Sequence, residues 1–275
     1  MISVSVNITI DNKLDNTMKA MRELALLSLA FLCMPMAAQD KVEATVQADL
    51  VSKYLWRGQE LGHISIQPKA SVSWKGLSLT ALGNVGFDKE DTEEFNLQLN
   101  YTLKGFNIGV IDYWKSGVDP EGRYLYYDRD KGPHTFEGNI GYTCKYFSLQ
   151  AYTVFWGIDE TPHNAMAIGS TMAETEHERA YSTYIEAAVP FRLGGLNWTL
   201  MGGMTPFRSA GKTAEFLKIA NEYNYADGIA CIKAALRATK ELNLGEVRMP
   251  LFAEIHMNPY MQKAYFSMGL SVIPF

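Results

Sequence analysis

The chain has 275 residues, a net charge of −5 and 47% apolar residues. This length allows one large domain or two small ones, and the modest negative charge gives no indication of a nucleic-acid partner. Mean hydropathy is −0.11, and the absence of any run of about 18 apolar residues argues against a helical membrane protein. A transmembrane β-barrel passes this test, because roughly half of each of its strands is polar.

The N-terminal region has the order of a secretory signal peptide: basic, then apolar, then small residues. Lys19 and Arg22 precede an apolar stretch over residues 24–33, about half the length that spans a bilayer as a helix. We predict that residues 1–38 are removed, and the simplest interpretation of the segment upstream of the signal is that translation starts at Met18.

The mature chain, residues 39–275, then forms one domain. Twelve of its segments alternate apolar and polar residues with a period of two, as strands do between an apolar medium and water. In the clearest one, Ile64, Ile66 and every second residue after them share an apolar face. The twelve segments are 42–56, 63–74, 77–88, 94–103, 106–114, 134–144, 147–156, 179–191, 196–205, 227–241, 246–257 and 263–275.

The connections between these segments alternate in length. Every second junction is short, as at 75–76 and 104–105, whereas three of the others, 115–133, 157–178 and 206–226, are long. Outer-membrane barrels alternate short periplasmic turns with longer outer loops in this way. We therefore predict an all-β fold, a transmembrane antiparallel up-and-down β-barrel of about 12 strands. Helical spacing also predicts a short helix over 212–224.

A compact motif closes the first predicted strand. Ser52, Lys53, Tyr54, Leu55, Trp56, Arg57 and Gly58 follow one another there. This run resembles the S-x-Y-x-W/F-R-G signature of the TorF-like porin family of bacterial outer-membrane β-barrels. The resemblance implies a pore in the bacterial outer membrane, and places Ser52, Tyr54, Trp56, Arg57 and Gly58 in the family motif.

Two aromatic groups have alternative interpretations. Trp56 and Arg57 could gate the pore or bind a solute, but we favour an aromatic-belt anchor with a snorkelling or inward-facing arginine. Tyr124, Tyr126 and Tyr127 of the third outer loop could fold inward as a constriction that stacks on sugars. For these tyrosines we favour an ordinary exposed loop.

Charged residues on the predicted inward faces are the candidate pore-lining residues. Opposed charges on different walls would set a transverse field across a water-filled lumen and select solutes by charge and size. The alternative is a narrow barrel plugged by its own ion pairs, since twelve strands lie between the filled eight-stranded and the open sixteen-stranded barrels. We favour the open pore. The candidates are Asp49, Lys69, Glu94, Glu137, Glu186, Lys233, Arg237, Arg248 and Glu254.

The sequence presents no catalytic or metal-binding motif. His63 and His256 are predicted to face the lumen, but no nucleophile or acid–base motif surrounds them. We therefore predict a channel, with no enzymatic activity, cofactor or metal, through which small hydrophilic solutes diffuse passively and whose outer face contacts outer-membrane lipid. Two alternatives stay open: an outer-membrane enzyme acting on lipid, and a closed structural or adhesive barrel.

Overall fold

The computed structural model describes residues 41–88, 91, 93–129, 131–157, 159, 181–207, 225–226 and 228–274. The predicted signal peptide and the predicted helix over 212–224 lie outside the described residues. In the part of the chain that is described, no helix is long and apolar enough to cross a membrane. All the strands belong to one compact unit, Val42–Phe275.

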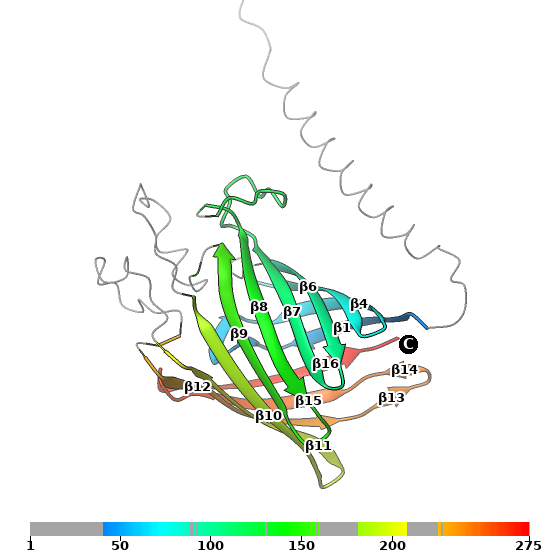
Figure 1. Cartoon of the computed structure of the whole chain (residues 1–275). Coiled ribbons are helices and arrows are strands. Elements are labelled where there is room, and N and C mark those ends of the chain that lie inside the picture. The colour runs from blue at the N-terminus through cyan, green and yellow to red at the C-terminus, as the bar shows by residue number, and fades with distance from the viewer. Residues whose placement is uncertain are drawn as a thin grey trace, which may run out of the picture. The chain divides into compact units, whose positions relative to one another are not determined.

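Twelve antiparallel strands pair in chain order and close into a barrel (Figure 1). The barrel closes where the first strand pairs with both its successor in the wall and the last strand, which confirms the predicted fold. The wall strands are β1 (Glu43–Val51), β4 (Ser65–Trp74), β5 (Leu77–Gly86), β6 (Glu94–Leu103), β7 (Phe106–Lys115), β8 (His134–Thr143), β9 (Ser148–Gly157), β10 (Thr183–Leu193), β11 (Leu196–Thr205), β12 (Ala230–Lys240), β15 (Leu251–Asn258) and β16 (Lys263–Val272).

Two short hairpins are not part of the wall. They stand where two of the predicted strands were too long. The first predicted strand ends at Val51, and the residues after it form β2 (Tyr54–Trp56) and β3 (Gln59–Gly62). Before β15, β13 (Asn243–Leu244) pairs with β14 (Val247–Arg248). Pro250 separates this second hairpin from the wall, because a proline has no N–H to donate to a sheet.

The two ends of the barrel differ, as predicted. One end, the short-turn end, carries tight connections such as Lys75-Gly76 and Lys104-Gly105 and both ends of the barrel's chain. In both turns the two central residues have positive φ, 50° and 85° in the first, as in type I′ turns, whose twist matches that of the flanking strands. The other end, the long-loop end, carries 116–133, 158–182 and 206–229.

The outward face of the barrel is apolar and exposed. Aliphatic side chains such as Leu79, Leu99 and Ile140, each 51–61% exposed, occupy its middle. Exposed aromatic residues flank them at both ends: Trp74, Tyr101, Phe106, Tyr146, Phe147 and Phe191 at the short-turn end, and Phe87, Phe155, Tyr181, Phe207 and Tyr260 at the long-loop end. An apolar face of this extent is stable only against an apolar medium or a partner.

Candidate functional site: the lumen and its inward hairpin

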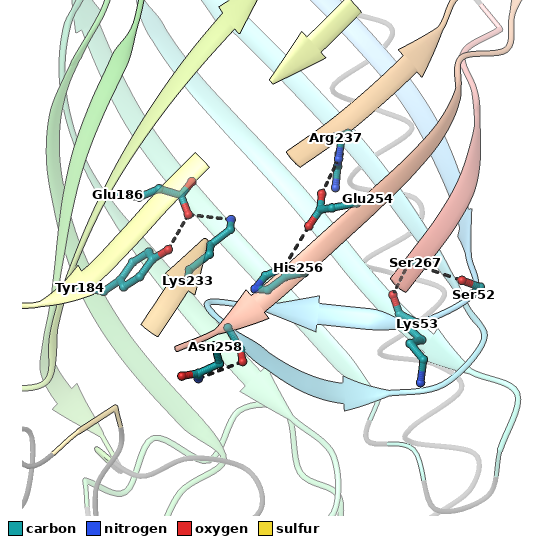
Figure 2. A network of polar contacts seen from close by, with 11 residues as sticks. Ser52, Lys53, Tyr184, Glu186, Lys233, Arg237, Glu254, His256, Asn258 and Ser267 are labelled. Carbon is teal, nitrogen blue, oxygen red and sulfur yellow. Dashed lines mark hydrogen bonds and ion pairs between the residues drawn. The ribbon is translucent and has the colours of Figure 1, made fainter. Parts of the chain in front are cut away.

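The β2–β3 hairpin folds into the lumen instead of extending the wall. We call residues 52–62, which carry it, the strap. At its base, Ser267 of β16 donates to the Lys53 carbonyl (3.3 Å), and near its tip Asn258 of β15 donates to the Gly58 carbonyl (3.0 Å) (Figure 2). Tyr54 donates to Glu94 of β6 (2.9 Å). These partners stand on separate strands of the wall, so the strap crosses the lumen.

Arg57 at the tip of the strap is the residue most firmly held there. It is 7% exposed, and its two terminal nitrogens donate to the two carboxylate oxygens of Glu137 on β8 over 2.6 and 2.7 Å. Nη1 also donates to Tyr225 (2.6 Å), and Tyr113 donates to Glu137 (2.9 Å). Bidentate arginine–carboxylate pairs are among the strongest hydrogen-bonded contacts in proteins.

Aromatic rings enclose the same guanidinium group. The carbon Cζ of Arg57 lies 4.5 Å from the ring centroids of Trp56 and Tyr152 and 4.8 Å from that of Tyr184. Cation–π attraction is strongest when water is excluded, as it is here. The strap is therefore fixed to the wall of β8–β10 by one buried charge with ionic, hydrogen-bonded and aromatic partners.

The Arg57-Gly58 pair forms the turn of the strap. Arg57 has a φ of 46° and Gly58 a φ of 87°, again as in a two-residue type I′ turn. A Cβ on Gly58 would lie 1.8 Å from the carbonyl oxygen of Ile232 on β12. Only glycine fits both the conformation and the contact, so this position brings the strap against the wall.

The structure changes the interpretation of the motif aromatics. Trp56 packs inside the barrel against Tyr113 and Tyr225, with ring centroids 6.4 and 6.1 Å apart. The aromatic-belt interpretation of Trp56 is therefore wrong, whereas Arg57 does face inward. The alternating pattern could not separate the two possibilities, because a hairpin that crosses a lumen alternates in the same way as a strand in the wall.

Ion pairs span the inner face from β10 to β12. Lys233 donates to Glu186 (2.8 Å), which also accepts from Tyr184 (2.5 Å) (Figure 2). Gly203 of β11 lies between them, and a Cβ there would come within 2.2 Å of the Tyr184 hydroxyl. The glycine leaves room for this network to cross an intervening strand.

A second group lies on β12 and β15. Arg237 donates through Nε to Glu254 (2.6 Å), and Nδ1 of His256 lies 3.0 Å from the other oxygen of that carboxylate (Figure 2). The Arg237 guanidinium stacks 4.3 Å from the ring of Phe252. Nε2 of His256 is buried and has no hydrogen-bond partner among the described residues.

All the candidate pore-lining residues except Arg248 lie on the inner face of the wall. Asp49 lies on the inner face of β1 and accepts from Gln47 (2.7 Å), and Lys69 lies on the inner face of β4, opposite Gln47. Arg248 lies in the β13–β14 hairpin, 3.7 Å from Glu241, and not on the wall. Most of the charges of the inner-face candidates are neutralised by near neighbours, so the predicted field between opposed walls is replaced by local pairs.

Burial divides the lumen into two halves. In the long-loop half, each of the twelve wall strands contributes at least one buried inward residue: Val51, Ser65, Asn84, Glu94, Ile111, Glu137, Val154, Tyr184, Thr205, Ile232, His256 and Ser267. In the short-turn half, inward residues such as Ser71, Thr80, Asn107 and Gln150 are partly accessible. The expected open pore is therefore absent from the long-loop half, which the strap and paired side chains fill.

The tyrosine-rich loop packs on the outside of the barrel. Tyr127 stacks on the ring of His134, with centroids 4.0 Å apart, and Nε2 of His134 donates to the Tyr124 carbonyl (2.5 Å). Nδ1 of His134 lies 2.8 Å from Asp112, which explains a carboxylate on an otherwise apolar face. Burial, with a smaller effect of nearby Tyr127, raises the pKa of Tyr124 to about 12. The alternative of an inward tyrosine constriction is wrong.

Two histidines lie outside the lumen. Nε2 of His134 faces a carbonyl oxygen, which only accepts, so this nitrogen carries a proton and serves to anchor the loop. His63, predicted to face the lumen, is instead exposed at the long-loop end near Asp91. Among the described residues, no group of three or more His, Cys, Asp or Glu side chains could hold a metal ion.

Sequence reasoning missed two residues that hold the strap, Tyr225 of a long connection and Asn258 of β15. Tyr225 and Asn258 lie 168 and 200 positions from their partners in the strap. No local pattern marks such contacts. The one available signal was Gly58, since glycine suits the positive φ that a type I′ hairpin turn requires.

Comparison with known proteins gives only distant similarity. No protein-family model matches the chain, and no curated protein matches it. Among solved structures, an outer membrane channel from Pseudomonas putida F1 shares 10% identity over 87% of this chain and 96% of its own, with a TM-score of 0.38. OccD1 (OprD) with two substitutions shares 12% over 84% and 64%, with a TM-score of 0.35.

A structure from work on the in-meso crystallization of membrane proteins is similarly distant, with 8% identity over 84% of this chain and 82% of its own and a TM-score of 0.38. Similarities at this level assign neither a family nor a function. The class of protein defined by the fold is a closed twelve-stranded antiparallel barrel.

Proposed function

We propose that the protein is an outer-membrane channel for passive diffusion of small hydrophilic solutes, and that the strap controls its opening. The observation that carries this proposal is the opposition of the two faces of the barrel. The exposed apolar band with aromatic residues at both ends suits acyl chains and their interfaces. The inner face is polar and ion-paired, and partly accessible in its short-turn half.

In this proposal the short turns are periplasmic and the long loops lie outside the cell, as in other outer-membrane barrels. The accessible half of the lumen then opens to the periplasm, and the strap closes the outer half. Conduction requires the tip of the strap to leave β8–β10. Separating Arg57 from Glu137 inside the protein costs about 3–5 kcal/mol, so the open state is populated on the order of 1% or less, at about tenfold per 1.4 kcal/mol.

Planar-bilayer recording of the purified mature protein tests this function. The wild type should give rare, brief conductance steps, and Arg57→Ala should increase their frequency at least tenfold, because the tip of the strap loses its main attachment. Arg248→Ala is the matched control, since Arg248 lies off the wall beside Glu241. It should leave the steps unchanged.

A closed structural or adhesive barrel is the second candidate, favoured by the filled long-loop half. Silence of both the wild type and Arg57→Ala in bilayers, with both proteins folded, would support it and exclude the channel. Solubility of the mature chain without detergent would exclude both candidates. The proposal includes no catalytic step and no cofactor.

A further inference from the structure

Uncharged amide side chains line one wall of the accessible half of the lumen. They occupy inward positions on neighbouring strands, so they form one continuous surface. Asn107 of β7 and Gln150 of β9 exchange two hydrogen bonds of 3.0 Å each. The members of this surface, which we call the amide wall, are Gln98, Asn100, Asn107, Asn139 and Gln150.

Two inward glycines let these amides lie flat. Gly109 pairs with both Asn100 and Asn139, and a Cβ on it would lie 2.1 Å from the Asn100 side-chain oxygen and 2.6 Å from that of Asn139. A Cβ on Gly141 would lie 2.1 Å from the side-chain oxygen of Gln150. The amides therefore lie across the wall, over the glycines, and Gln98, Asn100, Asn107 and Gln150 stay partly accessible.

The amide wall has unused hydrogen-bonding capacity. A side-chain amide offers two N–H donors and an oxygen with two lone pairs, more than the mutual bonds of Asn107 and Gln150 consume. Asn139 is 6% exposed, and Asn96, which lies on β6 toward the long-loop end, is 7% exposed. Their side-chain oxygens have no hydrogen-bond partner in the described part of the chain. Buried acceptors are normally satisfied by protein groups or by water.

The charges around this space do not favour an ion. Glu186 is paired with Lys233 and Glu254 with Arg237. Asp49 and Lys69 carry opposite charges on the paired strands β1 and β4, so a charged solute would meet little net field. Arg237 faces the lumen with its side chain 42% exposed, stacked on Phe252. Its terminal N–H groups are donors beside a flat apolar ring.

From these groups we infer that the amide wall and Arg237 form a binding site for neutral polyhydroxylated solutes, the class of saccharides and polyols. A hydroxyl group both donates and accepts, which matches an amide on both counts, and the C–H face of a sugar packs on an aromatic ring. Passage of the solute through the barrel rests on the proposed function. Binding does not, because a solute can enter from the short-turn end while the strap stays in place.

Calorimetric titration of the purified protein in detergent tests the site, with maltotriose as the probe and succinate and choline as charged probes. Maltotriose should bind saturably and more tightly than either ion. Asn107→Ala/Gln150→Ala should weaken its binding at least tenfold. Asn243→Ala, in the β13–β14 hairpin, is the matched control and should leave binding unchanged.

A second variant guards against loss of fold. Gly141→Ala removes no polar group, and the three atoms nearest to its new Cβ all belong to the flexible end of Gln150. The barrel should therefore form, while the displaced amide weakens binding. Absence of saturable maltotriose binding, preference for succinate or choline, or unchanged affinity in both lumen variants would overturn the inference. Maltotriose binding by a protein that never conducts would refute the channel and leave the binding site standing.

Discussion

Arg57 and Glu137, 80 positions apart in the chain, meet inside the barrel in a bidentate ion pair with N–O distances of 2.6 and 2.7 Å. One partner belongs to the strap and the other to the wall, and both are buried, at 7% and 1% side-chain exposure. In the proposed channel, this pair joins the strap, which would obstruct passage, to the wall, which would form the passage. Its strength therefore bears on both stability and conduction.

Breaking the pair on one side should destabilise the barrel. Glu137→Leu leaves the Arg57 charge buried without its carboxylate, which costs about 3–5 kcal/mol. Arg57→Met/Glu137→Leu removes both charges and should be more stable than Glu137→Leu alone. The free energy of unfolding in urea, in lipid vesicles, measures both. Equal destabilisation by the single and double variants would show that the charges are not coupled.

Gly58 provides a test of the strap that removes no charge. Gly58→Ala places a Cβ against the Ile232 carbonyl at a positive φ, so the tip of the strap must move away from β12. Bilayer conductance steps should become several-fold more frequent than in the wild type. Gly245→Ala, also at positive φ but with nothing within 4 Å, is the control for backbone strain. Equal step frequencies in the two variants would contradict a role for the strap.

The base of the strap can be locked chemically. The hydroxyl oxygens of Ser52 and Ser267 lie 3.5 Å apart, close enough for Ser52→Cys/Ser267→Cys to form a disulfide. Cys144 and Cys231 are free and are replaced by serine in this background. With Arg57→Ala added, oxidation should suppress the conductance steps and a reductant should restore them. Steps of the same frequency in both redox states would show that the strap need not move at its base.

The fold was more predictable from the sequence than the site. Alternation specifies which side chains face water and which do not, and the wall strands obey this rule over almost their whole length. The strap obeys it too, so alternation at Tyr54 and Trp56 could not show that the chain had left the wall. The partner of Arg57 lies at Glu137, and only the closure of the barrel brings them together.

Ion selectivity should report the pairing of lumen charges. With Glu186 and Lys233 bonded over 2.8 Å, the open channel should pass potassium and chloride with a permeability ratio of about 1. Glu186→Gln leaves Lys233 positively charged without its carboxylate. It should shift the permeability ratio several-fold toward chloride, as measured from the reversal potential. Glu241→Gln, beside Arg248 outside the wall, should leave it unchanged. A wild type already strongly selective for either ion would contradict the local-pair arrangement.

Neighbouring residues on β6 test which face meets lipid. Leu99 is 51% exposed on the outward face, whereas Asn100 points into the lumen. Leu99→Arg places a charge among acyl chains, at a cost of about 2–4 kcal/mol near the middle of the bilayer. Asn100→Arg places the same charge beside water and should cost much less. The free energy of folding into lipid vesicles measures the difference, and a larger loss for Asn100→Arg would reverse the assignment of the two faces.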